Sequence, residues 1–563
     1  MSMFVSLRRL VLGIIAAGYC FLCEAQQQKK NKPDLEKSLV GYWKLSGDIK
    51  DRSGNDLPVV KHGQVDLRGG AGTGNNAQSA VFDGRGAWLE VPAGSKIHPG
   101  KEDFSVTAWI YTENALDDVP GDIISLYDPS AKRGFQLSLK DNAGITSHAN
   151  YRQLSFGIDD NVSSGWKDCG KPGNALLAFG TAEYKGELYA GTCETGSNEA
   201  GHVYRYAGAD KWVDCGSPDR SNSVVALAVL NGALYAGTGN YRVRGSSLPD
   251  SENTTPGGRV FRYVAPNQWV DCGRLPGVET IGGMIVFNGK LYASSMYSPA
   301  AFYRYEGGDT WVKCSVPGDK RVVNMAVYNG YLYATSWDHG NVYRYDGNAW
   351  TDCGPVGDNT QTYAFAVYEG GLYVATWPSG RVYRFDGINK WTDAGRLGKE
   401  LEVMGMLVHN GRLMGGTLPL AEVYAYEGDT TWVRMDQLDK TPDVKYRRAW
   451  SMGEHAGKVF CTTLPSGKVY SFEAGKSVVS KEELPAGWQH VAAIKTGNRL
   501  KLFINGRLAN EAVIPASMAF NLDSDASLKI GFGSGDYFYG RMREVRLYHR
   551  ALDEAEIAGL MKK

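Results

Sequence analysis

The sequence predicts an all-β protein in which a seven-bladed β-propeller interrupts a second β domain. Three observations support this prediction. The chain of 563 residues contains 70 glycines and 11% aromatic residues, a composition that suits many short strands joined by tight turns. One motif recurs seven times between residues 166 and 472. The segments on either side of this array do not repeat, and neither holds enough strands to form a two-sheet domain alone.

The repeating unit joins a Trp-x-Asp-Cys-Gly run, an apolar run, a Gly-x-Leu-Tyr-Ala-Gly-Thr run and a Val-Tyr-Arg-Tyr run. The marker tryptophans are Trp166, Trp212, Trp269, Trp311, Trp350, Trp391 and Trp432. Their intervals are 46, 57, 42, 39, 41 and 41 residues, and a period near 40 with four strand-like runs is typical of propeller blades. The third runs begin at Val203, Val260, Phe302, Val342, Val382, Val423 and Val469. This count predicts seven blades.

The two ends of the array predict how the ring closes. The first copy contains only the outer run, at residues 166–170, whereas the last copy lacks a clear outer run. We therefore expect the N-terminal strand to complete the last blade, which leaves no open sheet edge. A unit whose ends meet can be inserted into a loop of another domain. The predicted boundaries are 162–476 for the propeller, with 37–161 and 477–563 forming the interrupted domain.

The N-terminal residues predict secretion. Residues 1–25 combine Arg8 and Arg9, an apolar run and a small-x-small cleavage site, as secretory signal peptides do. The apolar run is too short for a membrane span. Cys20 leaves a lipoprotein as the alternative. Residues 26–36 are polar and predict a disordered leader. We expect the mature chain to be secreted, either extracellular or periplasmic, with no membrane span after signal removal.

The overall charge argues against two classes of partner. The formal net charge is zero and the isoelectric point is about 7.1. Proteins that bind nucleic acid or anionic membranes through electrostatics carry basic patches or a basic excess. We therefore expect a glycan or protein partner and no nucleic acid.

Motifs in both flanks suggest a known family. The first flank contains YWKLSGDIKDRSGN, VFDGRGAWLEVP and DFSVTAWIY, and the second contains GWQHVAAI, LKLFINGRL, LKIGFG and GRMREVRLYHRALDEAEIAGL. Together these segments resemble the laminin-G-like, concanavalin A-like jelly-roll domains. The resemblance implies a two-sheet jelly-roll sandwich assembled from both flanks and interrupted by the propeller.

The same resemblance implies calcium as a cofactor, because acidic loops in this family often hold that ion. The matching positions are Asp51, in Asp-x-Ser-Gly-Asn, and Asp83, in Phe-Asp-Gly. Arg543 stands on the last strand where the family commonly has a carboxylate. The alternative is that both aspartates cap turns by accepting backbone N–H groups.

The propeller offers a candidate ligand-binding surface where each second strand ends. Trp337 and Trp377 occupy this position in neighbouring repeats, with Tyr297, Asp338 and His339 close by in sequence. Such residues predict an aromatic platform with polar groups at its edge, which suits a sugar ring. The alternative is that the two tryptophans pack between blades. The long loop at residues 240–258 carries further charged residues and is either a binding loop or a tolerated insertion.

The sequence contains none of the catalytic motifs expected of enzymes with these folds. The sequence lacks the Glu-x-Asp-x-x-Glu strand of glucanases, the repeated box of sialidases, phosphate loops and nucleophile elbows. The repeated cysteines of the Trp-x-Asp-Cys-Gly run occupy equivalent positions in successive blades, too far apart for a disulfide. Cys193 and Cys461 are the one candidate pair for a bridge.

These observations lead to one functional expectation with two alternatives. We expect a secreted, non-catalytic binding protein that recognises carbohydrate, although the carbohydrate part rests on fold analogy. The first alternative is an extracellular protein-interaction scaffold. The second is a glycan-active hydrolase or lyase that uses the propeller channel.

Overall fold

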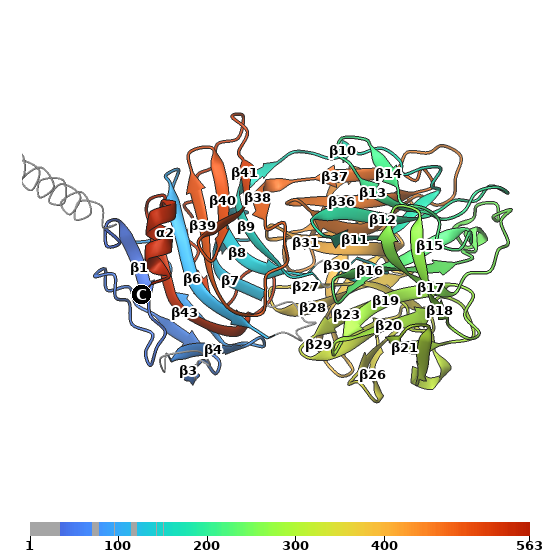
Figure 1. The fold of residues 1–563 in the computed structure, drawn as a ribbon, viewed down its shortest axis with the longest axis horizontal. Coiled ribbons are helices and arrows are strands. Elements are labelled where there is room, and N and C mark those ends of the chain that lie inside the picture. The colour runs from blue at the N-terminus through green and yellow to red at the C-terminus, as the bar shows by residue number, and fades with distance from the viewer. Residues whose placement is uncertain are drawn as a thin grey trace, which may run out of the picture.

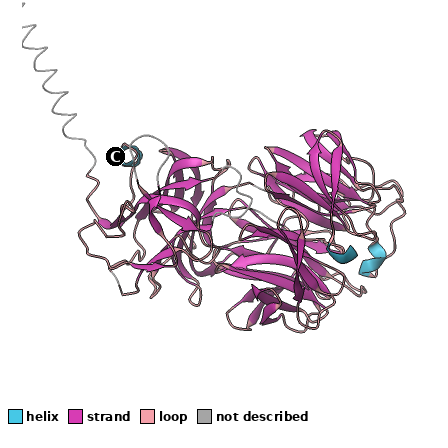
Figure 2. Ribbon diagram, turned by 90° about the horizontal axis from the view of Figure 1, so that it is seen from below, coloured by secondary structure: helices cyan, strands magenta, loops and turns pink. Residues whose placement is uncertain are grey.

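The computed structural model describes residues 34–69, 78–94, 96–113, 121–141, 144–149 and 151–562. The predicted signal peptide, Cys20 and most of the predicted leader lie outside these residues. Within them the protein is nearly all β, as predicted (Figures 1 and 2). The helices described are α2 (Glu554–Leu560) and the 3-10 turns η1 (Val243–Ser246) and η2 (Pro317–Asp319). None of the helices in the described ranges has the length and apolarity needed to span a membrane.

One sheet of the sandwich combines strands from both flanks. Its order is β3-β4-β43-β6-β39-β40-β41, and β1 also pairs with β43. The strands are β1 (Leu39–Trp43), β3 (Asp66–Gly69), β4 (Ser79–Asp83), β6 (Phe104–Thr112), β39 (Gly487–Thr496), β40 (Arg499–Ile504), β41 (Arg507–Val513) and β43 (Tyr539–Tyr548). Strand β6 of the first flank thus lies between two strands of the second. We call this the outer sheet, because it is the sheet farther from the propeller (Figure 1).

The other sheet faces the propeller, and we call it the inner sheet. Its order is β2-β5-β42-β7-β8-β9-β38. The strands are β2 (Val60–His62), β5 (Trp88–Val91), β7 (Gly121–Asp128), β8 (Arg133–Lys140), β9 (Gln153–Ser163), β38 (Ala474–Val479) and β42 (Leu528–Ile530). Phenylalanines of both flanks, such as Phe104, Phe135 and Phe538, are fully buried in one core between the sheets. The expectation of one sandwich built from two flanks is therefore confirmed.

The propeller consists of antiparallel four-stranded units. Four separate sheets are β19–β22 (Ile281–Phe287, Lys290–Ser295, Phe302–Gly307, Thr310–Cys314), β23–β26 (Met325–Tyr328, Tyr331–Thr335, Asn341–Tyr345, Trp350–Pro355), β27–β30 (Gln361–Tyr368, Gly371–Trp377, Arg381–Gly387, Lys390–Arg396) and β31–β34 (Glu402–His409, Arg412–Leu418, Glu422–Tyr426, Trp432–Gln437). A fifth has the order β10-β37-β36-β35 (Lys167–Asp168, Val469–Phe472, Lys458–Leu464, Arg448–His455).

The remaining propeller strands form one eight-stranded sheet. They are β11–β14 (Leu177–Tyr184, Glu187–Cys193, Val203–Tyr206, Trp212–Asp214) and β15–β18 (Ser223–Leu230, Ala233–Gly239, Arg259–Ala265, Gln268–Arg274). The two halves are joined by a single pair, Cys193 with Ser223. The structure therefore has five separate four-stranded blades, and a count of seven requires each half of this sheet to be taken as a blade.

The N-terminal strand closes the ring as predicted. Strand β10 pairs with β37, Lys167 opposite Ser471 and Asp168 opposite Tyr470. The Lys468 ammonium also lies 2.6 Å from the Asp168 carboxylate. The first and last residues of the array thus share one sheet, which leaves both propeller ends beside the sandwich.

Six of the seven marker tryptophans, all except Trp166, tie their blade to the preceding one through the indole N–H. Trp212 Nε1 donates to the carbonyl oxygen of Cys169 at 2.9 Å, and Trp269 Nε1 donates to that of Cys215 at 3.0 Å. Trp311 and Trp391 make the same bond to Cys272 and Cys353. A buried indole N–H needs an acceptor, and here the acceptor is supplied by the neighbouring repeat.

A short segment of the sandwich enters the ring of inner propeller strands. We call residues 144–149, between β8 and β9, the channel plug. His148 forms a parallel bridge with Ala228 of β15, and the Met284 amide of β19 donates to the Thr146 carbonyl at 3.1 Å. Ile145 is buried in the apolar cluster that the inner strands form. The plug thus gives the propeller and the sandwich a shared core.

Candidate functional site

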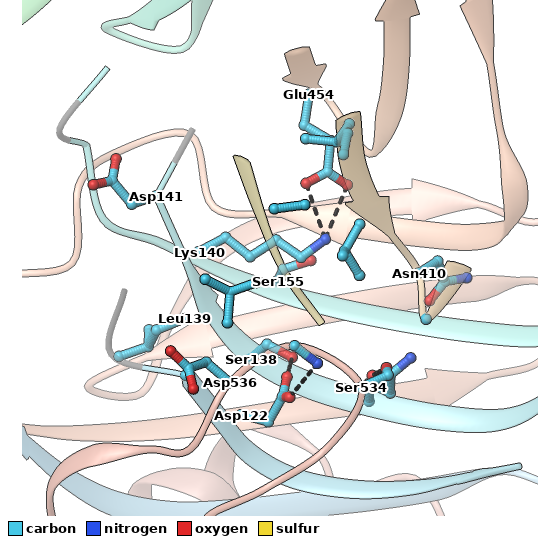
Figure 3. A pocket seen from close by; sticks show the side chains of 18 of the residues that line it. Asp122, Ser138, Leu139, Lys140, Asp141, Ser155, Asn410, Glu454, Ser534 and Asp536 are labelled. Atoms are coloured by element: carbon cyan, nitrogen blue, oxygen red, sulfur yellow. Dashed lines mark hydrogen bonds and ion pairs between the residues drawn. The ribbon is translucent and has the colours of Figure 1, made fainter. Parts of the chain in front are cut away.

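A pocket of about 170 Å³ lies between the inner sheet of the sandwich and the propeller (Figure 3). We call it the sandwich–propeller pocket. Strands β7, β8 and β9 supply its polar floor, and residues near the ends of the first strands of several blades supply its apolar roof. The apolar roof residues are Ile285, Val327, Phe365, Val367, Met406, Leu407 and Val408.

Strand alternation explains the polar floor. Along β8, Phe135, Leu137 and Leu139 are buried in the sandwich core. Side chains of a strand alternate between its faces, so the residues between them face the propeller. These are Gln136 and Ser138 with Lys140 at the strand end, and all three line the pocket. Strand β8 therefore places its apolar side chains in the sandwich core and these polar side chains in the pocket floor.

Asp122 is the buried carboxyl group of the floor. Ser138 Oγ donates to Asp122 Oδ1 at 2.5 Å, and the Gly535 amide donates to Oδ2 at 2.8 Å. Burial raises the pKa of Asp122 above its ordinary value, against the opposing effect of these two hydrogen bonds. The group is thus held in place by neighbours on β8 and on the loop before β43.

Glu454 brings a second carboxyl group to the pocket from the propeller. Lys140 Nζ lies 2.9 Å from both of its oxygens, and His409 Nδ1 lies 2.5 Å from Oε1. Burial alone would raise the pKa of Glu454, but the Lys140 ammonium and His409 outweigh it and lower the pKa to about 2. Glu454 is therefore an anion at neutral pH with both oxygens occupied.

Gln136 carries a hydrogen-bonding group that the described residues leave unpaired. Its Oε1 accepts from Ser534 Oγ, whereas its Nε2 is buried without a partner. The side chain is 6% exposed and lines the pocket. An unpaired buried amide costs about 1–3 kcal/mol, so this position favours an acceptor inside the pocket.

The predicted sugar platform lies at the opposite end of the channel. Trp377 pairs with Gln361 at the start of β27, whereas the sandwich–propeller pocket is lined by residues near the end of that strand. Trp337, Trp377 and Tyr297 are each partly buried against one large apolar cluster that residues of several blades form. We call this end of the channel the free mouth.

The polar residues of the predicted platform have other roles. Asp338 accepts from Arg321 at 2.6 and 3.0 Å, and the Arg321 guanidinium lies 5.9 Å from the Trp337 ring. His339 is exposed and has a positive φ of 69°. Asp338 therefore holds Arg321 beside the Trp337 ring, and both of its carboxylate oxygens are already hydrogen-bonded.

The free mouth contains two charged residues that the sequence analysis missed. Glu402 and Arg448, at the starts of β31 and β35, are 3% and 8% exposed. Glu402 Oε1 and Arg448 Nε lack partners among the residues the structure describes, as do the indole nitrogens of Trp337 and Trp450. Burial raises the pKa of Glu402. The sequence signal for Glu402 and Arg448 was a charged residue at the first position of a mostly apolar strand.

The two predicted calcium ligands act as turn caps. Asp51 accepts from the Tyr42 and Ser53 amides at 3.0 and 2.9 Å. Asp83 Oδ1 accepts from the Arg85 and Ala87 amides at 2.9 and 3.0 Å. Across the described ranges, His, Cys, Asp and Glu side chains form no group of three or more that could hold a metal ion. The two loops thus do not present a calcium ligand set, and calcium binding stays a prediction.

The candidate disulfide does not form. Cys193 and Cys461 are free and fully buried, and burial raises the pKa of both thiols.

Comparison with known proteins supports the sandwich assignment. Residues 430–558 match the family model of the concanavalin A-like lectin/glucanases superfamily. This match covers less than half of the chain. It begins beside β34 of the propeller and continues through the sandwich strands of the second flank. No curated protein matches the chain.

Several solved structures are similar to part of the chain at low sequence identity. A catalytically inactive virginiamycin B lyase from Staphylococcus aureus with quinupristin is 10% identical, covers 55% of this chain and 99% of its own, and has a TM-score of 0.42. YCF48 from Cyanidioschyzon merolae is 11% identical, covers 55% and 99%, and has a TM-score of 0.40. The extracellular domain of a putative one-component system from B. thetaiotaomicron is 11% identical, covers 60% and 46%, and has a TM-score of 0.41. At these values the similarities carry no functional argument.

Proposed function

We propose that the protein is a non-catalytic carbohydrate-binding protein whose sugar site is the sandwich–propeller pocket. The observation that carries the proposal is the buried, unpaired Gln136 Nε2 in a pocket with a polar floor and an apolar roof. The match of residues 430–558 to a superfamily of lectins and glucanases supports the same class of ligand. The predicted signal peptide supports secretion.

The floor retains hydrogen-bonding capacity for a polyhydroxylated ligand. A Lys ammonium carries three hydrogens, and Lys140 directs it to two oxygens of Glu454, which leaves one. Ser138 Oγ donates to Asp122 and keeps its acceptor sites. Together with Gln136 Nε2, these groups offer both donors and an acceptor to sugar hydroxyls.

The roof complements the apolar side of a sugar. Pyranose rings expose C–H groups on one side, and small-ligand sites generally combine apolar walls with a few placed polar groups. Phe365 and Met406 of two adjacent blades lie across the pocket from the floor. A pyranose ring between these residues and the floor would place its C–H groups against the apolar roof and its hydroxyl groups against the polar floor.

A glycan-active hydrolase is the second candidate, and one observation favours it. Asp122 and Glu454 line the same pocket with their pKa values shifted in opposite directions, an arrangement that acid–base pairs use. We favour binding because each oxygen of both carboxyl groups already accepts a hydrogen bond. In hydrolysis, one carboxyl must donate its proton and the other must reach water or the anomeric carbon.

The test is a glycan-array screen of the full chain, with and without calcium, followed by the same screen on four variants, one of which is Asp51→Asn. Gln136→Met removes the unpaired amide at similar length and should abolish binding. Trp337→Ala combined with Trp377→Ala should leave binding intact. Asp122→Asn distinguishes the second candidate, because loss of product formation from a bound glycan would identify catalysis.

Each of the remaining outcomes would place the sugar site elsewhere or favour a different function. Binding that survives Gln136→Met but vanishes in the double tryptophan variant would move the sugar site to the free mouth, where Glu402 Oε1 and Arg448 Nε have no partner among the described residues. Binding that requires calcium and is lost in Asp51→Asn would place the site on the sandwich loops. Absence of binding to every glycan would contradict the proposal and favour the protein-interaction scaffold.

A further inference from the structure

Aromatic and arginine side chains form two rows across the exposed side of the outer sheet. Register places Arg543, Trp109 and His490 opposite one another on β43, β6 and β39, and places Arg541, Tyr111 and Trp488 in the next row. Helix α2 covers the other end of this side, where Ile557 and Leu560 pack on Ala492 and Ile494. The two rows lie beyond the helix, far from the sandwich–propeller pocket.

Arg543 is clamped between two tryptophan rings. Its guanidinium carbon lies 4.5 Å from the Trp488 ring centroid and 5.6 Å from that of Trp109. Arg541 lies 5.1 Å from the neighbouring Tyr111 ring. Stacking of this kind orders a long side chain before any ligand binds, so the entropy cost of positioning the guanidinium is already met by the fold.

The Arg543 guanidinium has no hydrogen-bond acceptor among the residues that the structure describes. Among the hydrogen bonds and ion pairs of the described residues, none involves its side chain. The adjacent carboxylate, Glu544, accepts from Tyr42 Oη at 2.7 Å and from Arg546. The pairing of β43 with β6 shifts register between Arg543 and Arg546. Burial lowers the pKa of Arg543, and the charge of Glu544 opposes this effect without cancelling it.

We infer that Arg543, clamped by Trp109 and Trp488, binds the carboxylate of an acidic sugar on the exposed side of the outer sheet. A guanidinium presents five N–H donors in a planar fork that fits a carboxylate. Trp109, Tyr111 and Trp488 are partly exposed around it and offer apolar surface for the sugar ring. This site is separate from the sandwich–propeller pocket in position and in ligand charge.

Other features of the face fit a binding role. His490 is 1% exposed, and neither ring nitrogen has a partner in the part of the chain that the structure describes. Its ring contacts Trp109 edge to face at 5.3 Å. Burial, followed by the charge of Arg546, lowers the pKa of His490 to about 4. The ring is thus neutral at physiological pH and supports Trp109 without competing with Arg543 for the anion.

The test is calorimetric titration of the full chain with trigalacturonate and with neutral galactotriose. We expect trigalacturonate to bind and galactotriose not to bind at this site. Raising the salt concentration from 50 to 500 mM should weaken trigalacturonate binding, because charge attraction is screened. Arg543→Gln should reduce its affinity at least tenfold, whereas Arg507→Gln, on the same sheet, should leave it unchanged.

Two further variants separate the possible failures. Arg543→Lys keeps the charge but loses the planar fork, so we expect an intermediate affinity and an unchanged melting temperature. Gln136→Met should leave trigalacturonate binding intact, which separates this site from the sandwich–propeller pocket. Equal affinity in wild type and Arg543→Gln would overturn the proposal, as would absence of binding. Equal binding of a triglutamate peptide would assign the face to acidic peptides instead.

Discussion

Lys140 of the sandwich donates to both carboxylate oxygens of Glu454 in the propeller, each at 2.9 Å. The Glu454 side chain is 7% exposed, so this pair is one of the buried links between the two parts of the chain. Its geometry also fixes one wall of the sandwich–propeller pocket.

Removing Lys140 should destabilise the protein. Lys140→Met would leave a buried carboxylate with His409 as its remaining partner, and breaking a buried pair in this way costs about 3–5 kcal/mol. Urea unfolding followed by tryptophan fluorescence measures the change. Lys313→Met, at an exposed position on β22, is the matched control. An identical urea midpoint for both variants would contradict the assigned role.

Glu454 should make stability depend on acid pH. Its pKa is lowered from 4.5 to about 2 on folding, so the unfolded state binds more protons between these values. The contribution is fully present above pH 4.5 and is lost as pH falls through 2. Its size is about 3 kcal/mol. In Glu454→Gln, urea unfolding should lose this part of the pH dependence, and an unchanged profile would show that other carboxyl groups cause it.

Gly180 of the propeller should not tolerate a side chain, because it packs directly against the channel plug. A Cβ built on Gly180 of β11 would lie 1.9 Å from Ser147 Oγ of the plug. Gly180→Ala should therefore displace the plug and cost about 1–3 kcal/mol, visible as a lower melting temperature. Gly245→Ala is the control, because nothing lies within 4 Å of its Cβ. Equal melting temperatures would show that the plug does not pack as described.

Thiol labelling should distinguish the repeated cysteines. Of the seven free cysteines in the described residues, six are buried and Cys314 is partly exposed. Burial raises the pKa of Cys314 as well, so its labelling should be slow at pH 7 and faster at pH 9. Mass spectrometry of the native protein after maleimide treatment should find Cys314 modified first. Labelling of Cys193 or Cys461 without unfolding would contradict their burial.

Much of the fold was predictable because the repeat encodes its own contacts. The Trp-x-Asp-Cys-Gly motif supplies both the indole donor and the carbonyl acceptor that join neighbouring blades, as with Trp212 and Cys169. The jelly-roll motifs of the two flanks predicted one sandwich, and β6 between β43 and β39 confirms it. The single pairing of Cys193 with Ser223, which merges two units into one sheet, has no counterpart in the repeat.

The sandwich–propeller pocket was less predictable, because its residues are far apart in sequence. Gln136 and Glu454 become neighbours of one cavity only after the propeller docks on the inner sheet. Trp337 and Trp377 were identified from their repeat position, and the structure does place them on one cluster. The pairing of Asp338 with Arg321 could not be predicted, since Arg321 lies outside the repeated runs.

The proposed sugar site lies between the inner sheet and the propeller. The most direct measurement is a crystal structure of the full chain with the best ligand from the glycan screen. We predict a sugar ring in the sandwich–propeller pocket, with an oxygen within hydrogen-bonding distance of Gln136 Nε2 and its C–H side against Phe365. An empty pocket with the sugar bound at Trp337 and Trp377 would contradict the claim.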